Sequence, residues 1–325
     1  MRKASLVVSF HQNDRIFDID DPVVNHDNIT RQWYELREEF ARRGYKLCTH
    51  DLHPPGESEV VIYHDVPIDP PSPEFKDRSI LLTMEPPVVK ARAWEPAVQS
   101  MFRKVLTWDD RLVDGERFFK LRYGFHFPQS IPKDASRRKK LCTAIIGRKR
   151  SKAIGELYSE RLRAIYWFEQ KHPEEFEFYG IGWEGKKGPL GLRILGALTG
   201  KWPLSSYRGK ASTKLETYAN YRFAICYENV RIPGYLTEKL FDCLFSGIVP
   251  VYLGAPNISE LVPADCFIHK EDYPTYASLY DRLKSIDEVE YMGYLDRIEA
   301  YVRSDAACPF HATSFAKTVV DAALG

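Results

Sequence analysis

Residues 221–256 hold the charged side chains whose spacing is most suggestive of chemistry. A β-rich run ends at Glu228, an apolar helical pattern follows, and a second β-rich run spans 249–253. Together these elements predict a βαβ crossover, with Glu238 and Lys239 in the first turn of its helix. In open α/β sheets, ligands bind at the carboxyl ends of the strands, where this helix begins.

The residue types at this helix start fit a nucleotide sugar. Unbonded backbone N–H groups and the helix dipole attract phosphate, and Lys239 adds a mobile cation. Glu238 cannot bind phosphate, but its carboxylate can accept hydrogen bonds from the vicinal hydroxyls of a ribose or a sugar ring. The combination of an anion site and a diol site indicates a nucleotide sugar. The alternative is a solvated helix start that binds nothing.

Four motifs in this stretch resemble the donor-binding signature of the glycosyltransferase family 10 fucosyltransferases. In order they are Tyr221-Arg222-Phe223, Tyr227-Glu228-Asn229, Tyr235-Leu236-Thr237-Glu238-Lys239 and Val249-Pro250-Val251-Tyr252-Leu253-Gly254. The resemblance covers the C-terminal part of the chain well and the rest in outline. It implies an inverting transfer of fucose from GDP-fucose to a glycan hydroxyl. Its donor-binding residues would include Asn229, Tyr235, Glu238 and Lys239.

Nothing in these motifs specifies guanine or fucose independently of the resemblance. The same fold acting on another nucleotide sugar is therefore an alternative. A protein that binds a nucleotide or glycan without catalysis is a second one. A hydrolase is disfavoured, because no close pair of carboxylates falls in one predicted pocket.

The composition is that of a globular protein with ordinary surface charge. The chain has 325 residues, of which 44% are hydrophobic and 28% charged, and its formal net charge is +1. No basic excess indicates a nucleic-acid partner. The six cysteines contain no C-x-x-C pair, which favours reduced thiols in a cytoplasmic protein. No segment has the length of a membrane span, so contact with a membrane-borne acceptor is expected to be peripheral.

The strand and helix patterns predict an α/β fold of the GT-B class, with two facing Rossmann-like domains and the active site in the cleft between them. A Pro-rich, basic linker near 127–140 suggests domains at 1–135 and 136–325, on the acceptor and donor sides respectively. The last helix could pack back on the first domain. We expect a helix at 88–102 and a Gly-rich surface loop at 181–201. The absence of G-x-G-x-x-G and Walker A patterns argues against a dehydrogenase or P-loop enzyme.

A helix predicted at 153–171 carries an arginine on its apolar face. Arg161 lies one heptad after Ile154, whereas Arg163 points to the opposite face. A buried charge needs a partner, which could be an interior carboxylate or the diphosphate of the donor. The family resemblance implies the diphosphate, so Arg161 is the expected donor ligand and Arg163 the second choice.

An inverting transfer also needs a base for the acceptor hydroxyl. Glu85 is the expected base, because it follows a predicted strand at 80–83 and the two prolines after it stiffen its backbone. The family places a glutamate just after a strand in a T-G-E-like context, which Thr83-Met84-Glu85 resembles with methionine in place of glycine. Weaker alternatives are Asp65, Asp109 and Asp110.

No metal ion or other cofactor is expected beside GDP-fucose, which is the donor substrate. Lys239, Arg161 and the helix start can stabilise the leaving diphosphate, and Trp108-Asp109-Asp110 is not a metal-binding D-x-D motif. Lone histidines are more often structural than ligand-binding; those considered are His11, His64 and His126.

Overall fold

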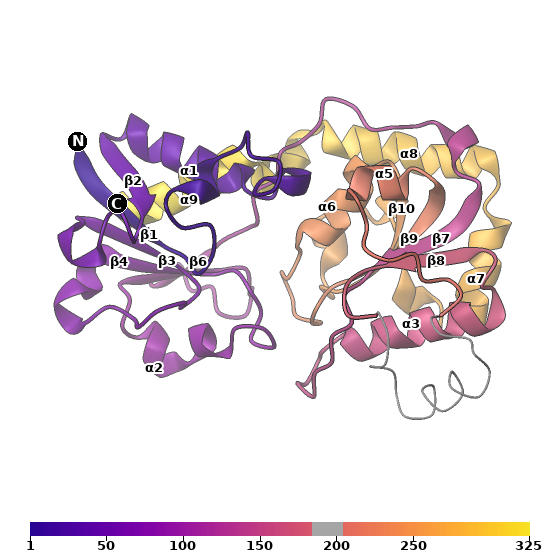
Figure 1. The fold of residues 1–325 in the computed structure, drawn as a ribbon, viewed down its shortest axis with the longest axis horizontal. Helices are drawn as coiled ribbons and strands as arrows, with labels where there is room; N and C mark the ends of the chain where they lie inside the picture. Colours follow the sequence, from indigo (N-terminus) through magenta and orange to yellow (C-terminus); the bar gives the residue numbers. More distant parts are fainter. Residues whose placement is uncertain (184–203) are drawn as a thin grey trace. The chain divides into compact units, whose positions relative to one another are not determined.

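The computed structural model describes residues 1–183 and 204–325, which form two units (Figure 1). Unit 1 comprises Met1–Phe127, Ile232–Glu238 and Asp305–Gly325, and unit 2 comprises Pro128–Arg231 and Lys239–Ser304. A linear division at residue 135 therefore omits two later segments that group with unit 1. The loop expected at 181–201 lies outside the described residues except for 181–183.

Unit 1 is built on a parallel sheet with the strand order β2-β1-β3-β4-β5-β6. Its central strands are buried on both faces, which explains their continuous apolar sequences. Its first strand, β1, is Arg2–Val7. The other strands are β2 Tyr45–Thr49, β3 Val60–His64, β4 Ser79–Thr83, β5 Lys104–Thr107 and β6 Phe118–Lys120.

Helices α1 (Arg31–Arg42) and α9 (Ala312–Leu324) lie side by side in unit 1, although they come from opposite ends of the chain (Figure 1). The rings of Trp33 and Phe315 meet edge to face between them, with centroids 5.5 Å apart. Helix α1 is amphipathic and buries Trp33, Leu36 and Phe40. α9 packs against it, so the chain end is part of the unit 1 core.

The prediction of a long helix at 88–102 is wrong. In its place are a 3-10 turn at Ala91–Trp94 and the short helix α2 at Pro96–Gln99. Pro96 has no backbone N–H to donate, and the residue before it, Glu95, takes an extended conformation (φ −70°, ψ 123°). The apolar residues of this segment are therefore buried by two separate short turns and not by one continuous helix.

Unit 2 has a second parallel sheet with the order β11-β10-β9-β7-β8. Its central strand, β9, is the first strand of the signature. The strands are β7 Lys140–Ile145, β8 Phe176–Tyr179, β9 Tyr221–Tyr227, β10 Val249–Leu253 and β11 Ile268–His269. The helices are α3 Tyr158–Lys171, α5 Lys214–Tyr218, α6 Glu238–Phe245, α7 Tyr276–Ser285 and α8 Glu288–Val302. Among the residues described, no helix combines the length and apolarity needed to cross a membrane.

Helix α3 begins later than its apolar pattern predicts. It starts at Tyr158, and the residues before it are irregular, with Gly155 at a φ of +78°. Ile154 is fully exposed and does not belong to the buried stripe. Arg161 nevertheless lies on the buried face with Ile165 and Phe168, so the predicted helical face is right although its starting point is wrong.

Gly234 allows the segment Ile232–Glu238 to approach the end of β5. Its φ is +80°, and a Cβ at this position would lie 2.2 Å from the backbone oxygen of Trp108 and 2.6 Å from Asp110 Oδ2. The backbone N–H of Asp110 also donates to Pro233 O at 3.4 Å. Only glycine satisfies both the conformation and the close approach.

We predict that Gly234→Ala destabilises unit 1 by more than the left-handed backbone alone would explain. Gly115 is the matched control, because it has a φ of +76° with no atom within 4 Å of the added Cβ. Gly115→Ala should cost about 1–2 kcal/mol for its backbone conformation, and Gly234→Ala should cost more because Trp108 must move. Urea unfolding of both variants measures the difference. Equal losses would contradict the close packing described.

Candidate donor site and base

The carboxyl edge of the unit 2 sheet carries a buried carboxylate next to a lysine. β9 ends at Tyr227, and the next residue, Glu228, is fully buried. Helix α6 begins at Glu238, so Glu238 and Lys239 lie in its first turn, as predicted, and the helix brings Lys239 back to this edge. Lys239 Nζ lies 3.4 Å from Glu228 Oε2, and the lysine side chain is 27% exposed. The lysine thus offsets the cost of burying the carboxylate while part of it still reaches solvent.

Gly254 leaves room for Glu228. A Cβ on Gly254 would lie 2.6 Å from Glu228 Cγ and 2.3 Å from Tyr252 Oη. The backbone N–H of Glu228 donates to Leu253 O at 2.8 Å, so the end of β9 is fixed against β10. The glycine that closes the last motif therefore has a packing reason to be there.

Arg161 joins the end of β9 to Asn229. Its Nε and Nη2 groups both donate to Tyr227 O, at 3.0 and 2.6 Å, and Nη2 also donates to Asn229 Oδ1 at 2.9 Å. Arg163 is different: its side chain is 72% exposed and its Nη1 lies 2.6 Å from Glu160 Oε2. The predicted contrast between the two helical faces is confirmed. Binding of a diphosphate by Arg161 stays a prediction.

Two signature residues, Tyr235 and Glu238, group with unit 1. Tyr235 is only 1% exposed, and its ring packs on Trp108 with centroids 4.5 Å apart. Glu238 is half-buried at the first position of α6. The structure gives the Tyr235 ring a packing role, and contact of either residue with a donor stays a prediction.

Glu85 follows β4 at the carboxyl edge of the unit 1 sheet, as predicted, and is half-buried. Its backbone N–H donates to Asp65 Oδ1 at 3.2 Å, and its backbone oxygen accepts from Trp94 Nε1 at 2.9 Å. These bonds hold the main chain of the turn at Glu85.

The weaker candidates for the base have partners of their own. Asp109 is buried and forms two hydrogen bonds with Arg111, at 2.8 and 2.6 Å. Asp110 lies 2.5 Å from Lys120 Nζ. Both carboxylates are thus engaged in ion pairs, and the choice of Glu85 as the base stays a prediction.

Burial governs the titration of His64, which ends β3, and of Asp65, which follows it. Asp65 is 1% exposed, and burial raises its pKa to about 7. Burial lowers the pKa of His64 to about 4, so this imidazole is neutral near pH 7. The ring of His64 packs edge to face on Trp33, which fits the structural role expected of a lone histidine.

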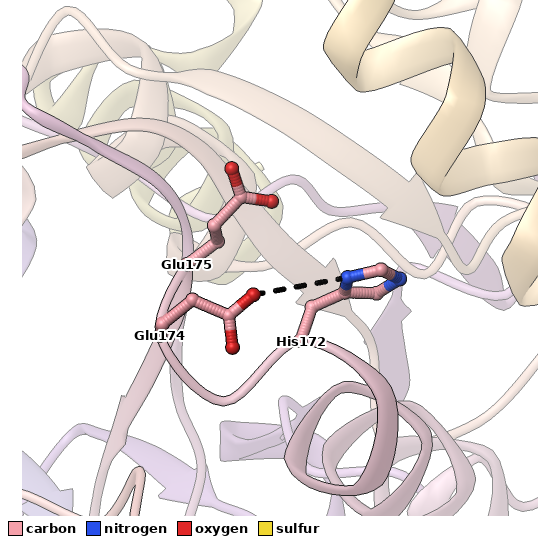
Figure 2. A group of neighbouring side chains, drawn as sticks. All are labelled: His172, Glu174 and Glu175. Atoms are coloured by element: carbon pink, nitrogen blue, oxygen red, sulfur yellow. Dashed lines mark ion pairs between the residues drawn. The ribbon is translucent and has the colours of Figure 1, made fainter.

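His172, Glu174 and Glu175 lie close enough together to hold a metal ion, with ligand atoms within 4.8 Å of one another. Figure 2 shows His172 and Glu174 pointing toward each other, and their ion-pair atoms are 4.0 Å apart. Glu175 is already bonded to Lys284 Nζ at 2.6 Å and Tyr280 Oη at 2.5 Å. The group precedes β8, at the amino edge of the sheet, so it lies away from the strand ends that carry the signature.

Sequence comparison places the C-terminal part of the chain with known fucosyltransferases. Residues 190–314 match the model of glycosyltransferase family 10 (fucosyltransferase) C-term. Alpha-(1,3)-fucosyltransferase 4 of Homo sapiens is 25% identical over 316 residues, which are 91% of this chain and 47% of that protein. The chain therefore spans about half the length of this relative. The resemblance predicted from the four motifs is confirmed.

Solved structures support the fold. A crystal structure of an alpha1,3-fucosyltransferase with GDP-fucose has a TM-score of 0.58 at 15% identity, covering 98% of this chain and 90% of the other. WaaG, a glycosyltransferase involved in lipopolysaccharide biosynthesis, has a TM-score of 0.55 at 11% identity, covering 99% of this chain and 100% of the other. With the two parallel Rossmann-like sheets, these neighbours confirm the predicted GT-B fold class.

Sequence reasoning missed the residues that hold the Glu85 turn. Trp94 and Trp108 are separated from Glu85 in sequence, and nothing in their spacing indicates that their indole N–H groups reach this turn. Glu228 was visible as part of a motif, but its burial beside Lys239 was not predicted. A buried glutamate at the end of an apolar strand was the available signal.

We predict that Arg161→Ala weakens donor binding and slows transfer, whereas Arg163→Ala changes both little. Arg161 fixes Tyr227 O and Asn229 at the end of β9, and its removal leaves that buried oxygen without two donors. Calorimetric affinity for GDP, together with turnover of GDP-fucose, compares the two variants. If Arg163 proved essential and Arg161 dispensable, the assignment of the functional helical face would be wrong.

Proposed function

We propose that the chain is an inverting glycosyltransferase that transfers fucose from GDP-fucose to a glycan hydroxyl. The observation that carries this proposal is the edge of the unit 2 sheet, where Lys239, Arg161 and Asn229 surround the end of β9. The match to the family 10 C-terminal region and the alpha-1,3-fucosyltransferase relatives support it.

The donor would bind through its diphosphate at the start of α6. The positive charges of Lys239 and Arg161, with the backbone N–H groups of the first helical turn, would stabilise the negative charge that develops on leaving GDP. The Glu238 carboxylate would accept hydrogen bonds from hydroxyls of the ribose or the fucose, and the Asn229 amide would donate to them. These roles use no metal ion, so we propose that none is needed for the chemistry.

Glu85 would act as the general base. The acceptor oxygen forms a bond to the anomeric carbon on the face opposite the diphosphate, while the bond from that carbon to the GDP oxygen breaks. The acceptor proton passes to the Glu85 carboxylate. Because bond formation and departure occur on opposite faces, the configuration inverts.

Two alternatives keep the same site. Another nucleotide sugar could replace GDP-fucose, since no residue described here specifies guanine. A non-catalytic nucleotide- or glycan-binding protein would also use Lys239 and Arg161, but it would have no use for a base at Glu85. The clamped backbone of Glu85 favours the enzyme.

We also propose a cytoplasmic location with peripheral contact to a membrane that bears the acceptor. All six cysteines are free thiols and five of them are buried, as expected where disulfides do not form. An oligosaccharide or glycan is the proposed partner, and nucleic acid is not.

GDP and GDP-fucose are expected to raise the melting temperature more than UDP, ADP or CMP, without added divalent metal. A ligand at about a hundred times its dissociation constant stabilises the folded state by roughly 2.7 kcal/mol. Differential scanning fluorimetry with and without EDTA measures the shifts. Equal shifts from every nucleotide, or a strict need for metal, would contradict the GDP assignment.

Glu85→Gln should lower transfer about 10²–10⁴-fold, because the amide cannot accept the acceptor proton. Its affinity for GDP should not change, since Lys239 and Arg161, the residues proposed to bind the diphosphate, belong to unit 2. Glu116→Gln is the control, because Glu116 is an exposed glutamate of unit 1. Near-normal turnover of Glu85→Gln, measured beside calorimetric GDP affinity, would remove this residue from the mechanism.

A further inference from the structure

Both backbone N–H groups of the two-residue turn Met84-Glu85 donate hydrogen bonds to one side chain. Asp65 Oδ1 accepts from the backbone N–H of Met84 at 3.0 Å and from that of Glu85 at 3.2 Å. One carboxylate oxygen thus fixes two successive peptide groups directly after β4. A backbone held in this way loses most of its freedom to rotate.

Side chains also donate hydrogen bonds to the two backbone oxygens of this turn. Trp108 Nε1 donates to Met84 O at 2.9 Å, and Tyr123 Oη donates to the same oxygen. Trp94 Nε1 donates to Glu85 O at 2.9 Å. Four side chains from separate parts of unit 1 therefore hold the turn that contains Glu85.

Asp65 is itself held in an unusual conformation. It follows β3 with a φ of +53°, its backbone N–H donates to Leu82 O at 2.8 Å, and the residue is 1% exposed. Left-handed backbone is rare outside glycine and costs stability, so it persists where the surroundings require it. In the described structure Oδ2 has no hydrogen-bond partner, and His64 Nε2 lies 3.9 Å from it.

We propose that Asp65 is the positioning residue of the base, and that its carboxylate fixes the turn from which Glu85 reaches the acceptor. This inference rests on the proposed function for the role of Glu85. Asp65 is unsuited to be the base itself, because Oδ1 is occupied by two N–H groups and Oδ2 is buried. A sub-ångström gain in positioning is valuable, since a displacement of about 1 Å can cost 10²-fold in rate.

The strength of this clamp depends on ionisation of Asp65. Burial raises its pKa to about 7, against the opposing effects of the two backbone N–H groups and Lys90. The nearby titratable groups are His64, Glu85 and Lys90, and His64 stays neutral above about pH 4. Hydrogen bonds to an ionised carboxylate are about twice as strong as neutral ones, so the clamp tightens as pH rises through this range.

Asp65→Asn and Asp65→Gly form a matched pair for the test. Asparagine tolerates left-handed backbone and keeps an oxygen that can accept from both N–H groups, but it cannot ionise. Glycine accepts the conformation and removes the oxygen. Any difference between the two variants therefore reports the hydrogen bonds to Met84 and Glu85.

Amide NMR of the full chain tests the clamp without any substrate. The amide proton signals of Met84 and Glu85 should titrate with a midpoint near pH 7 in the wild type and lose this titration in Asp65→Asn. In Asp65→Gly both amides should exchange with solvent about tenfold faster or more. Amides that ignore Asp65 ionisation and keep their protection in Asp65→Gly would overturn the proposal.

Stability gives a second readout, and it also checks that the variants fold. The folded-state pKa of Asp65 is raised to about 7 from 3.8, so between these values the unfolded chain has lost a proton that the folded chain keeps. Rising pH therefore favours unfolding of the wild type. The free energy of unfolding of the wild type should fall relative to that of Asp65→Asn from pH 4 to 7 and level off above. A constant difference would contradict the buried, titrating carboxylate.

Turnover of GDP-fucose with a panel of oligosaccharide acceptors then tests the consequence for catalysis. Asp65→Gly should lower kcat about 10- to 100-fold at unchanged GDP affinity, and Asp65→Asn should recover most of this loss. Normal kcat in Asp65→Gly would overturn the positioning role. If the wild type itself neither binds GDP nor transfers fucose, the proposed function fails, and the amide signals of Met84 and Glu85 still decide whether Asp65 holds the turn.

Discussion

The end of a parallel strand leaves backbone N–H and carbonyl groups without ladder partners, and this constraint organises both candidate sites. Buried groups of this kind must be bonded, and here side chains supply the bonds. Arg161 takes the last carbonyl of β9, at Tyr227. Asp65 takes the two N–H groups after β4, in the turn that ends at Glu85. The residues nearest the proposed chemistry are therefore bonded to main-chain groups at the edges of the sheets, so position and stability are coupled.

At the proposed donor site, the burial of a charged side chain also couples ligand binding to stability. Glu228 is fully buried and Lys239 lies 3.4 Å from it, while the lysine is also the cation expected to meet phosphate. Loss of the lysine would leave a buried carboxylate short of a counter-charge, which is strongly destabilising in general. A defect in a Lys239 variant would then mix lost donor binding with lost stability. The same mixing applies to Arg161, whose removal leaves the buried oxygen of Tyr227 without two donors, whereas Arg163 on the same helix is exposed.

The sequence predicted the elements whose signals are local and missed those set by distant contacts. Strand β9, helix α6 and strand β10 were predicted because β-rich runs and helical spacing are properties of neighbours in the chain. The helix at 88–102 was wrong because apolar spacing was counted without the effect of Pro96. The bonds of Trp94 and Trp108 to the Glu85 turn depend on how separate segments fold onto one sheet edge, which spacing does not encode. Glu85 was predicted as the base from a local signal, its place just after a strand, and its role stays a prediction.

The grouping of Ile232–Glu238 with unit 1 changes how the signature is understood. Gly234 approaches Trp108 O so closely that no side chain fits, and Tyr235 packs on the Trp108 ring. The same tryptophan donates through Nε1 to Met84 O, next to Glu85. A change at Gly234 or Tyr235 therefore acts on the turn that carries the proposed base, through a single ring. Both motif residues have a structural reason for their presence that does not depend on the donor, so impaired transfer in their variants would not by itself identify a donor contact.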